Sequence, residues 1–166
     1  MRVTLAGHGV GIPKVIDALN SIGHEVCCLV THPREIHEQD RDIIETLDRH
    51  GLYASIFEEA ENRRIPLLEI RDINDPASIE WIRSHKPDWI VSVSLRNILR
   101  SEFLDAFADR VLNLNMAPLP MYRGGAHDTW MILGNEREAY ASCHFIDKGL
   151  DTGAIVSTCP YTIPLK

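Results

Sequence analysis

Short apolar runs alternate along the chain with segments whose apolar residues recur at helical spacing. Runs bounded by Gly, Pro or polar residues predict strands, whereas spacing of three and four residues predicts helices. The predicted strands cover 2–7, 24–31, 65–70, 88–94, 110–115, 138–146 and 153–163. The predicted helices cover 12–23, 41–61 with an interruption near Gly51, 74–87 with Asn74 or Asp75 as cap, a short segment from Ser101, and 127–135.

This alternation predicts βαβ units and a mainly parallel central sheet with helices on both faces. The last two strands have no helix between them, so an antiparallel or mixed edge is expected there. With 166 residues, the chain is long enough for one domain, 1–166, and too short for two. It stops just after a strand that nothing would cover, so we expect a C-terminal helix or extension to be lacking.

Composition narrows the classes of partner. The formal net charge is −7, so nucleic acid is an unlikely partner. No stretch is apolar for long enough to span a bilayer, and the N-terminus lacks a signal-peptide core, which favours a cytoplasmic protein. The 4 cysteines have no CxxC spacing and are expected to be buried, reduced side chains. The 8 histidines form no HxxxH or HExxH pattern, so no metal is expected.

The stretch GHGVG (7–11) joins the first strand to a helix, where glycine amides and a helix N-terminus can meet an anion. It lacks the third glycine of the dinucleotide fingerprint, because Ile12 stands there, and no acidic residue ends the second strand. A nicotinamide site is therefore disfavoured. A tight turn that contacts a substrate through His8 and an ordinary turn remain open.

The stretch NLNMAPLP (113–120) follows an apolar strand, at the end where α/β proteins often place reactive groups. It offers two carboxamides, Asn113 and Asn115, and no group that can carry a proton. Downstream, His144 lies in a predicted strand and fits either a hydrogen-bonded core residue or a catalyst. Asp151 lies between two glycines, and taken alone this stretch favours a turn residue over a catalytic carboxylate.

Taken together, these stretches resemble the folate-dependent formyltransferase family, whose members use 10-formyltetrahydrofolate. In that family a strand ending Asn-x-His-x-Ser-x-x-Pro is followed by a Tyr-Arg-Gly loop and a Leu-Asp-x-Gly loop. This chain has NLNMAPLPMYRGG and, after HFIDK, GLDTG; its opening, THPRE and SVSLRNIL also resemble the family, so the likeness runs to about residue 163. The resemblance implies a Rossmann-like domain that transfers a formyl group to an amine.

The resemblance also assigns expected roles to residues. The catalytic Asn and Asp of the family fall on Asn113 and Asp151, whereas its catalytic His is replaced by Asn115 and its Ser by Ala117. The folate is expected near the segment from Ser92 to Leu99 and near the Asp loop, which gives Ser92, Ser94, Leu95, Arg96, Ile98, Asp147 and Leu150. The acceptor is expected near the first turn and the Tyr-Arg-Gly loop, which gives Gly7, His8, Gly9, Met121, Tyr122, Arg123 and Gly124.

The change at position 115 matters because amine attack on a formyl carbon moves a proton as well as charge. Asn113 can donate to the oxygen that becomes negative without any change of protonation. Asn115 cannot ionise, and losing acid–base help typically costs roughly 10²–10⁴-fold in rate, about 3–5 kcal/mol. His144 is our candidate for the missing imidazole, and His127 is the second choice.

The acceptor is expected to be a small-molecule amine. YRGGAHDTW resembles the branch of the family that acts on nucleotide-linked amino sugars, although the glycine-rich first turn keeps glycinamide ribonucleotide open. Members that act on initiator tRNA usually carry an additional C-terminal domain, and none is expected here. A folate- or substrate-binding relative without catalysis is the competing hypothesis, and the sequence leaves the oligomeric state open.

Overall fold

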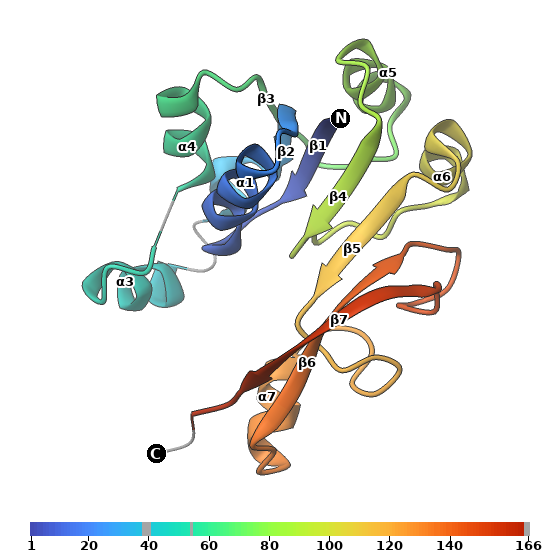
Figure 1. Ribbon diagram of the computed structural model, residues 1–166. Coiled ribbons are helices and arrows are strands. Elements are labelled where there is room, and N and C mark those ends of the chain that lie inside the picture. The colour runs from blue at the N-terminus through green and yellow to red at the C-terminus, as the bar shows by residue number, and fades with distance from the viewer. Residues whose placement is uncertain (38–40, 54, 165–166) are drawn as a thin grey trace. The chain divides into compact units, whose positions relative to one another are not determined.

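The structure, a computed structural model, describes residues 1–37, 41–53 and 55–164. It divides into two compact units, Met1–Ile98 and Leu99–Lys166 (Figure 1). Each unit is built around its own group of paired strands, and each carries one part of the predicted site.

The first unit contains four strands that pair in the order β3-β2-β1-β4, and every pairing is parallel. These strands are β1 (Arg2–Gly7), β2 (Glu25–Thr31), β3 (Leu67–Glu69) and β4 (Trp89–Val93). The helices are α1 (Gly11–Ser21), α2 (Arg34–His37), α3 (Arg41–Arg49), α4 (Ile56–Arg63) and α5 (Pro76–Ser84). Parallel strands joined through helices confirm the predicted βαβ organisation.

The core of this unit follows from the apolar runs in the sequence. Residues 3–7 of β1 and 26–31 of β2 are buried, as expected for parallel strands covered on both faces. α1 turns Ile12 and Ile16 into the core and contacts both β2 and α4. α5 begins with Pro76, whose missing amide hydrogen suits the first turn, and buries Ile79 and Ile82.

Three details of the first unit differ from the sequence prediction. α2 was not predicted, because four residues are too few to show a helical period. β3 keeps only Leu67–Glu69 of the predicted 65–70. Asp75 occupies the N-cap of α5 but its side chain makes no capping bond. The Asn74 amide instead donates to Asp72 Oδ1 and to the carbonyl of Ile98, so it ties two loops together.

The second unit contains three strands, and both of their pairings are antiparallel. They are β5 (Val111–Asn115), β6 (Glu138–Phe145) and β7 (Ile155–Thr162), with α6 (Ser101–Phe107) and α7 (His127–Leu133). The predicted antiparallel edge is thus confirmed. β7 pairs with β6 along one edge, where Pro160 lies opposite Tyr140.

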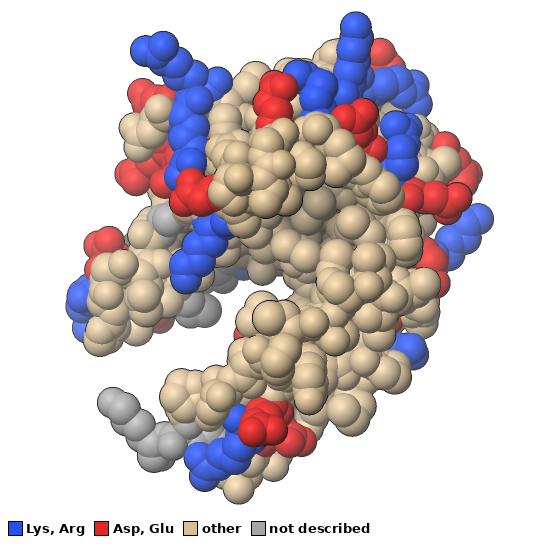
Figure 2. Space-filling model, in the orientation of Figure 1, with Lys and Arg blue, Asp and Glu red and all other residues tan. Residues whose placement is uncertain are grey.

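Cysteine burial and surface charge can be compared with the composition. Cys27 and Cys28 are buried as expected, but Cys143 on β6 is half-buried and Cys159 is exposed. Cys159 lies on β7, most of whose residues are exposed. Basic side chains on the visible face stand among acidic ones and form no continuous patch (Figure 2). Among the helices of the described residues, none is both long enough and apolar enough to cross a membrane.

Candidate active site

The centre of the candidate site is a contact between β5 and β6. Asn113 lies directly opposite His144 in the antiparallel register, and its Nδ2 lies 3.2 Å from Nε2 of the imidazole. The other ring nitrogen, Nδ1, lies 2.8 Å from the carbonyl oxygen of Phe145. Since a carbonyl only accepts, Nδ1 carries a hydrogen, which leaves Nε2 to face the Asn113 amide.

Asp151 faces this contact from the loop between β6 and β7. Its Oδ1 lies 3.7 Å from Nε2 of His144, and its Oδ2 accepts hydrogen bonds from Nδ2 of Asn115 and the amide of Gly124, at 3.1 and 2.9 Å. The side chains are well shielded, with 1% of His144 and 15% of Asp151 exposed. One carboxylate oxygen is therefore fully engaged, and the other faces the imidazole.

Asn115 is held at both ends of its amide. Its Oδ1 accepts the backbone N–H of Ala117 at 3.0 Å, which fixes the orientation of the amide and directs Nδ2 to Asp151. The residue is buried, with 7% exposure. Position 115 thus supplies a fixed neutral donor to the carboxylate.

The loop that carries Asp151 is closed by its own side chains. Oδ1 of Asp147 accepts hydrogen bonds from Oγ1 of Thr152 at 2.6 Å and from the amide of Gly149 at 3.0 Å. The bond from Thr152 is the main cause that lowers the pKa of Asp147. At Gly153 the backbone passes close to the backbone of Phe145. A Cβ at position 153 would lie 1.9 Å from the carbonyl oxygen of Phe145, so glycine is needed there. These contacts set the position of Asp151, whose φ is +51°.

Ser142 is a functional candidate that the sequence analysis missed. Its hydroxyl donates to the carbonyl of Ala117 at 2.8 Å and accepts the amide of Leu119 at 3.2 Å, so it pins the loop after β5 to β6. The side chain is buried, and the residue pairs with Asn115 across the two strands. Strand alternation could have identified it, because residues 142 and 144 share one face of β6.

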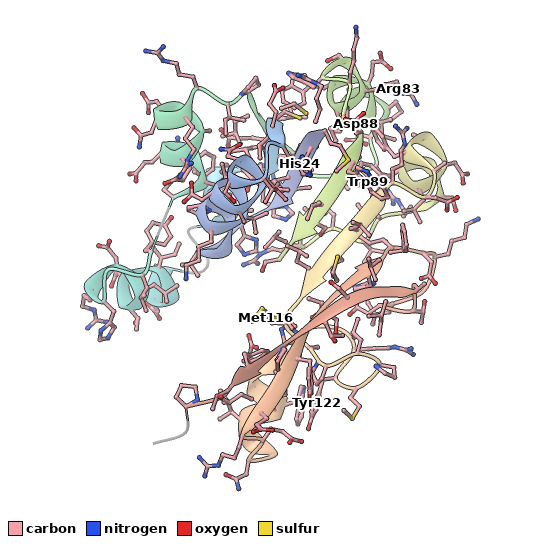
Figure 3. All side chains as sticks on the ribbon, in the orientation of Figure 1. His24, Arg83, Asp88, Trp89, Met116 and Tyr122 are labelled. Carbon is pink, nitrogen blue, oxygen red and sulfur yellow. The ribbon has the colours of Figure 1, made fainter. Side chains whose placement is uncertain are left out.

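The Tyr-Arg-Gly loop is anchored at two points, and Met116 and Tyr122 mark the segment that leads into it (Figure 3). The hydroxyl of Tyr122 donates to Oε1 of Glu136, just after α7, at 2.7 Å, and this bond is the main cause that raises the pKa of Tyr122. The amide of Gly124 binds Asp151. The remaining predicted members of the loop, Met121 and Arg123, are exposed and available to a ligand.

Leu150 and His127 also belong to the second unit. Leu150 is 60% exposed and its Cδ2 lies beside Gly124, where a Cβ would be 3.3 Å away. His127 opens α7, and its Nε2 lies 3.4 Å from the carboxylate of Asp128. His127 therefore lies beside Asp128, whereas His144 lies beside Asn113 and Asp151.

In the first unit, the glycine-rich turn lies where β1 meets α1. Gly7 has φ +144°, and a Cβ there would lie 1.7 Å from the carbonyl oxygen of Val93, so only glycine fits. The half-buried His8 donates its backbone amide to the same carbonyl at 3.1 Å, and Gly9 has φ +92°. The ring of His8 lies edge-on to that of His32, with centroids 6.1 Å apart.

The loop after β4, residues 94–98, is fixed by three side chains. The amide of Arg96 donates to Nε2 of His32 at 3.0 Å, Asn97 donates to the carbonyl of Arg71 at 3.1 Å, and Asn74 donates to the carbonyl of Ile98 at 3.0 Å. The predicted folate residues of this segment differ in access: Ser92 is buried, Leu95 is half-buried, and Ser94, Arg96 and Ile98 are exposed.

The structure thus brings the four predicted catalytic residues, Asn113, Asn115, His144 and Asp151, into one hydrogen-bonded and electrostatic cluster within the second unit. Among the described residues, no three His, Cys, Asp or Glu side chains are placed to hold a metal ion together. The predicted acceptor and folate residues fall on anchored loops of the two units.

Comparison with known proteins shows similarity to formyl transferases in both sequence and fold. Residues 1–163 match the protein family described as formyl transferase. The chain is similar to a phosphoribosylglycinamide formyltransferase from Bacillus halodurans, with 19% identity and a TM-score of 0.77 over 99% of this chain and 81% of that one.

Two further solved structures share the fold over about half of their own length. A formyltetrahydrofolate deformylase from Pseudomonas syringae is 18% identical with a TM-score of 0.68, over 98% of this chain and 51% of that one. A sugar 3N-formyl transferase, solved in the presence of dTDP and 5-N-formyl-THF, is 17% identical with a TM-score of 0.66. The match covers 98% of this chain and 52% of that one.

Proposed function

The chain belongs to the formyl transferase family, and from that premise we propose that it transfers a formyl group from 10-formyltetrahydrofolate to the primary amine of a small molecule, an amino-sugar nucleotide. The observation that carries the proposal is the cluster of Asn113, His144, Asp151 and Asn115 around a single shielded point. It combines a neutral donor for a developing negative charge with two groups that can accept a proton.

In the proposed reaction, the amine nitrogen forms a bond to the formyl carbon and gives up a proton. The bond between that carbon and N10 of the folate breaks, and N10 takes up a proton as tetrahydrofolate leaves. Asn113 is half-buried and donates a hydrogen bond to the oxygen as negative charge gathers on it. Asp151 accepts the amine proton at Oδ1, directly or through water. The Nε2 lone pair of His144, 3.7 Å behind Oδ1, accepts it in turn or stabilises it there. His144 thereby supplies the imidazole that position 115 lacks.

The folate supplies the formyl carbon, and the loops of this chain offer groups that suit it. A pterin ring is flat, with hydrogen-bonding groups along its edge, so fixed backbone groups and exposed apolar side chains are what it needs. The loop 94–98, anchored by His32, Asn74 and Asn97, provides the first, and the exposed Ile98 provides the second. Leu150 and Asp147 are the corresponding candidates in the second unit.

For the acceptor, we favour a nucleotide-linked amino sugar because the stretch YRGGAHDTW (122–130) resembles that branch of the family. The sugar formyl transferase of similar fold, solved with dTDP, is in keeping with this assignment. Glycinamide ribonucleotide is the second candidate, favoured by the similarity to phosphoribosylglycinamide formyltransferase. The third reading is a folate-binding relative without catalysis, which the complete engagement of the Asn115 amide favours.

The test is to incubate the protein with 10-formyltetrahydrofolate and a panel of amines, including amino-sugar nucleotides and glycinamide ribonucleotide, and to detect formylated product by mass spectrometry. Asn113→Ala serves as the inactive control and Asn115→His as the family-like form. Turnover by the wild-type chain, lost in Asn113→Ala, is expected. Activity only in Asn115→His would indicate a disabled site. Absence of folate binding in calorimetry would refute the proposal.

A further inference from the structure

The two oxygens of Asp151 have different environments, and the difference is created by Asn115 and Gly124. Oδ2 accepts two hydrogen bonds, from the side chain of Asn115 and the backbone of Gly124. Oδ1 faces only His144 among these groups, at 3.7 Å. A carboxylate oxygen that accepts two neutral donors is held in place, whereas its partner remains available for a proton.

The orientation of the Asn115 amide is fixed independently of Asp151. Ala117 donates its backbone amide to Oδ1 of Asn115, and the loop after Ala117 is pinned to β6 by the buried hydroxyl of Ser142. A flip of the Asn115 amide would place Nδ2 against the Ala117 N–H and Oδ1 against the carboxylate. Both contacts would become repulsive, so the amide has one orientation and always presents a donor to Asp151.

We propose that Asn115 is a positioning residue: its hydrogen bond fixes Oδ2 of Asp151 and turns Oδ1 toward Nε2 of His144. That Oδ1 then serves as the proton acceptor rests on the function proposed above. At position 115 the side chain therefore acts through Asp151 and needs no ionisation of its own. The Asn115 amide does not ionise near neutral pH, so its donor to Asp151 does not depend on a protonation state of its own.

Few other charged groups share this environment. His144 faces Asp151 from β6, and Asp147 in the same loop interacts electrostatically with His144. β5 contributes only the amides of Asn113 and Asn115. Arg123 neighbours Gly124 in sequence, but its side chain is exposed. The hydrogen bond from Asn115 is thus the main side-chain contact with Oδ2 that a substitution can remove.

The test measures the ionisation of Asp151 by carbon-detected NMR of its carboxyl group in the full chain, assigned with Asp151→Asn. Asn115→Ser keeps an oxygen that can accept the Ala117 amide but is too short to reach Asp151. The Asp151 carboxyl should titrate at higher pH in Asn115→Ser than in the wild type, because it loses a hydrogen bond that favours its charged form.

The isosteric Asn115→Asp gives a second and stronger perturbation. It places a like charge beside Oδ2, so the two carboxyls should titrate as a coupled pair whose upper midpoint moves further than that of the Ser variant. Asn62→Ala, on the exposed face of α4, removes an amide without touching this cluster and should leave the midpoint unchanged. Circular dichroism confirms that each variant is folded.

An unchanged Asp151 midpoint in both Asn115→Ser and Asn115→Asp would overturn the inference. The readout does not require turnover, so the two proposals can fail separately. Shifted midpoints in a protein that never formylates an amine would leave the positioning role standing and remove the function. Formyl transfer by a protein whose Asp151 midpoint does not shift in these variants would support the proposed function and remove the positioning role. Where turnover is present, the acidic limb of its pH profile should move in the same direction as the midpoint.

Discussion

Nε2 of His144 lies 3.7 Å from Oδ1 of Asp151, and the opposite nitrogen of the ring is bound to the carbonyl of Phe145. In this buried imidazole, Nε2 therefore faces Oδ1 of the carboxylate. A ring with both nitrogens committed in this way has a defined tautomer and a defined direction for proton movement.

Replacing His144 by Gln is expected to lower kcat for formyl transfer by roughly 10²–10⁴-fold, the usual contribution of acid–base help. Gln can still hydrogen-bond to Asn113 but cannot take a proton. The measurement is steady-state turnover with 10-formyltetrahydrofolate, beside folate affinity by calorimetry, which should change little. His50→Ala, at an exposed position, is the control. Full activity in His144→Gln would exclude the imidazole from proton transfer.

Replacing Ser142 by Ala is expected to reduce the free energy of unfolding by roughly 1–3 kcal/mol, because the carbonyl of Ala117 and the amide of Leu119 lose a buried partner. Urea denaturation measures the change. Ser157→Ala, on the exposed β7, should stay close to the wild type. Equal stability of the two variants would show that the loop does not depend on this hydroxyl.

Replacing Gly153 by Ala is expected to destabilise the fold by roughly 1–3 kcal/mol, the usual cost of overpacking. The new Cβ would lie 1.9 Å from the carbonyl oxygen of Phe145, so the Asp151 loop must shift. Gly125→Ala provides the control, since a Cβ at that position meets no atom within 4 Å. Thermal unfolding of both variants compares the two sites, and a tolerated Gly153→Ala would contradict the close approach.

The pH dependence of stability should reveal the bond between Thr152 and Asp147. This bond is the main cause that lowers the pKa of Asp147 from its ordinary 3.8, so the stabilisation is complete above that value and is lost as pH falls through the lowered pKa. The advantage of the wild type over Thr152→Val should therefore shrink in acid. Denaturation at several pH values measures it, with Thr158→Val on β7 as control. An advantage that is constant across pH would argue against the bond.

Much of the architecture could be predicted because it depends on local patterns. Continuous apolar runs identified buried strands such as β1 and β2, and the missing helix before β7 predicted the antiparallel pairing. The catalytic set came from resemblance to a family and not from periodicity. Strand alternation places Ser142 on the same face as His144, but its partners Ala117 and Leu119 follow from the register between β5 and β6, which no local pattern specifies.

The two hydrogen bonds of the Asn115 side chain could not be predicted from the sequence, for a similar reason. The motif placed Asn115 where the family has a histidine, and a comparison of side chains alone indicated a loss of function. Its neighbours Ala117 and Asp151 become partners only when the loop after β5 meets the loop after β6. The consequence of a substitution is thus decided by contacts made across the fold.

Pro160 of β7 lies opposite Tyr140 of β6, and it has a consequence for the behaviour of the protein in concentrated solution. Proline has no amide hydrogen, so the row of backbone donors along β7 is interrupted at position 160. A strand from another molecule that paired with β7 would lack one donor there. The interruption discourages edge-to-edge growth of sheets and thereby protects the protein from aggregation.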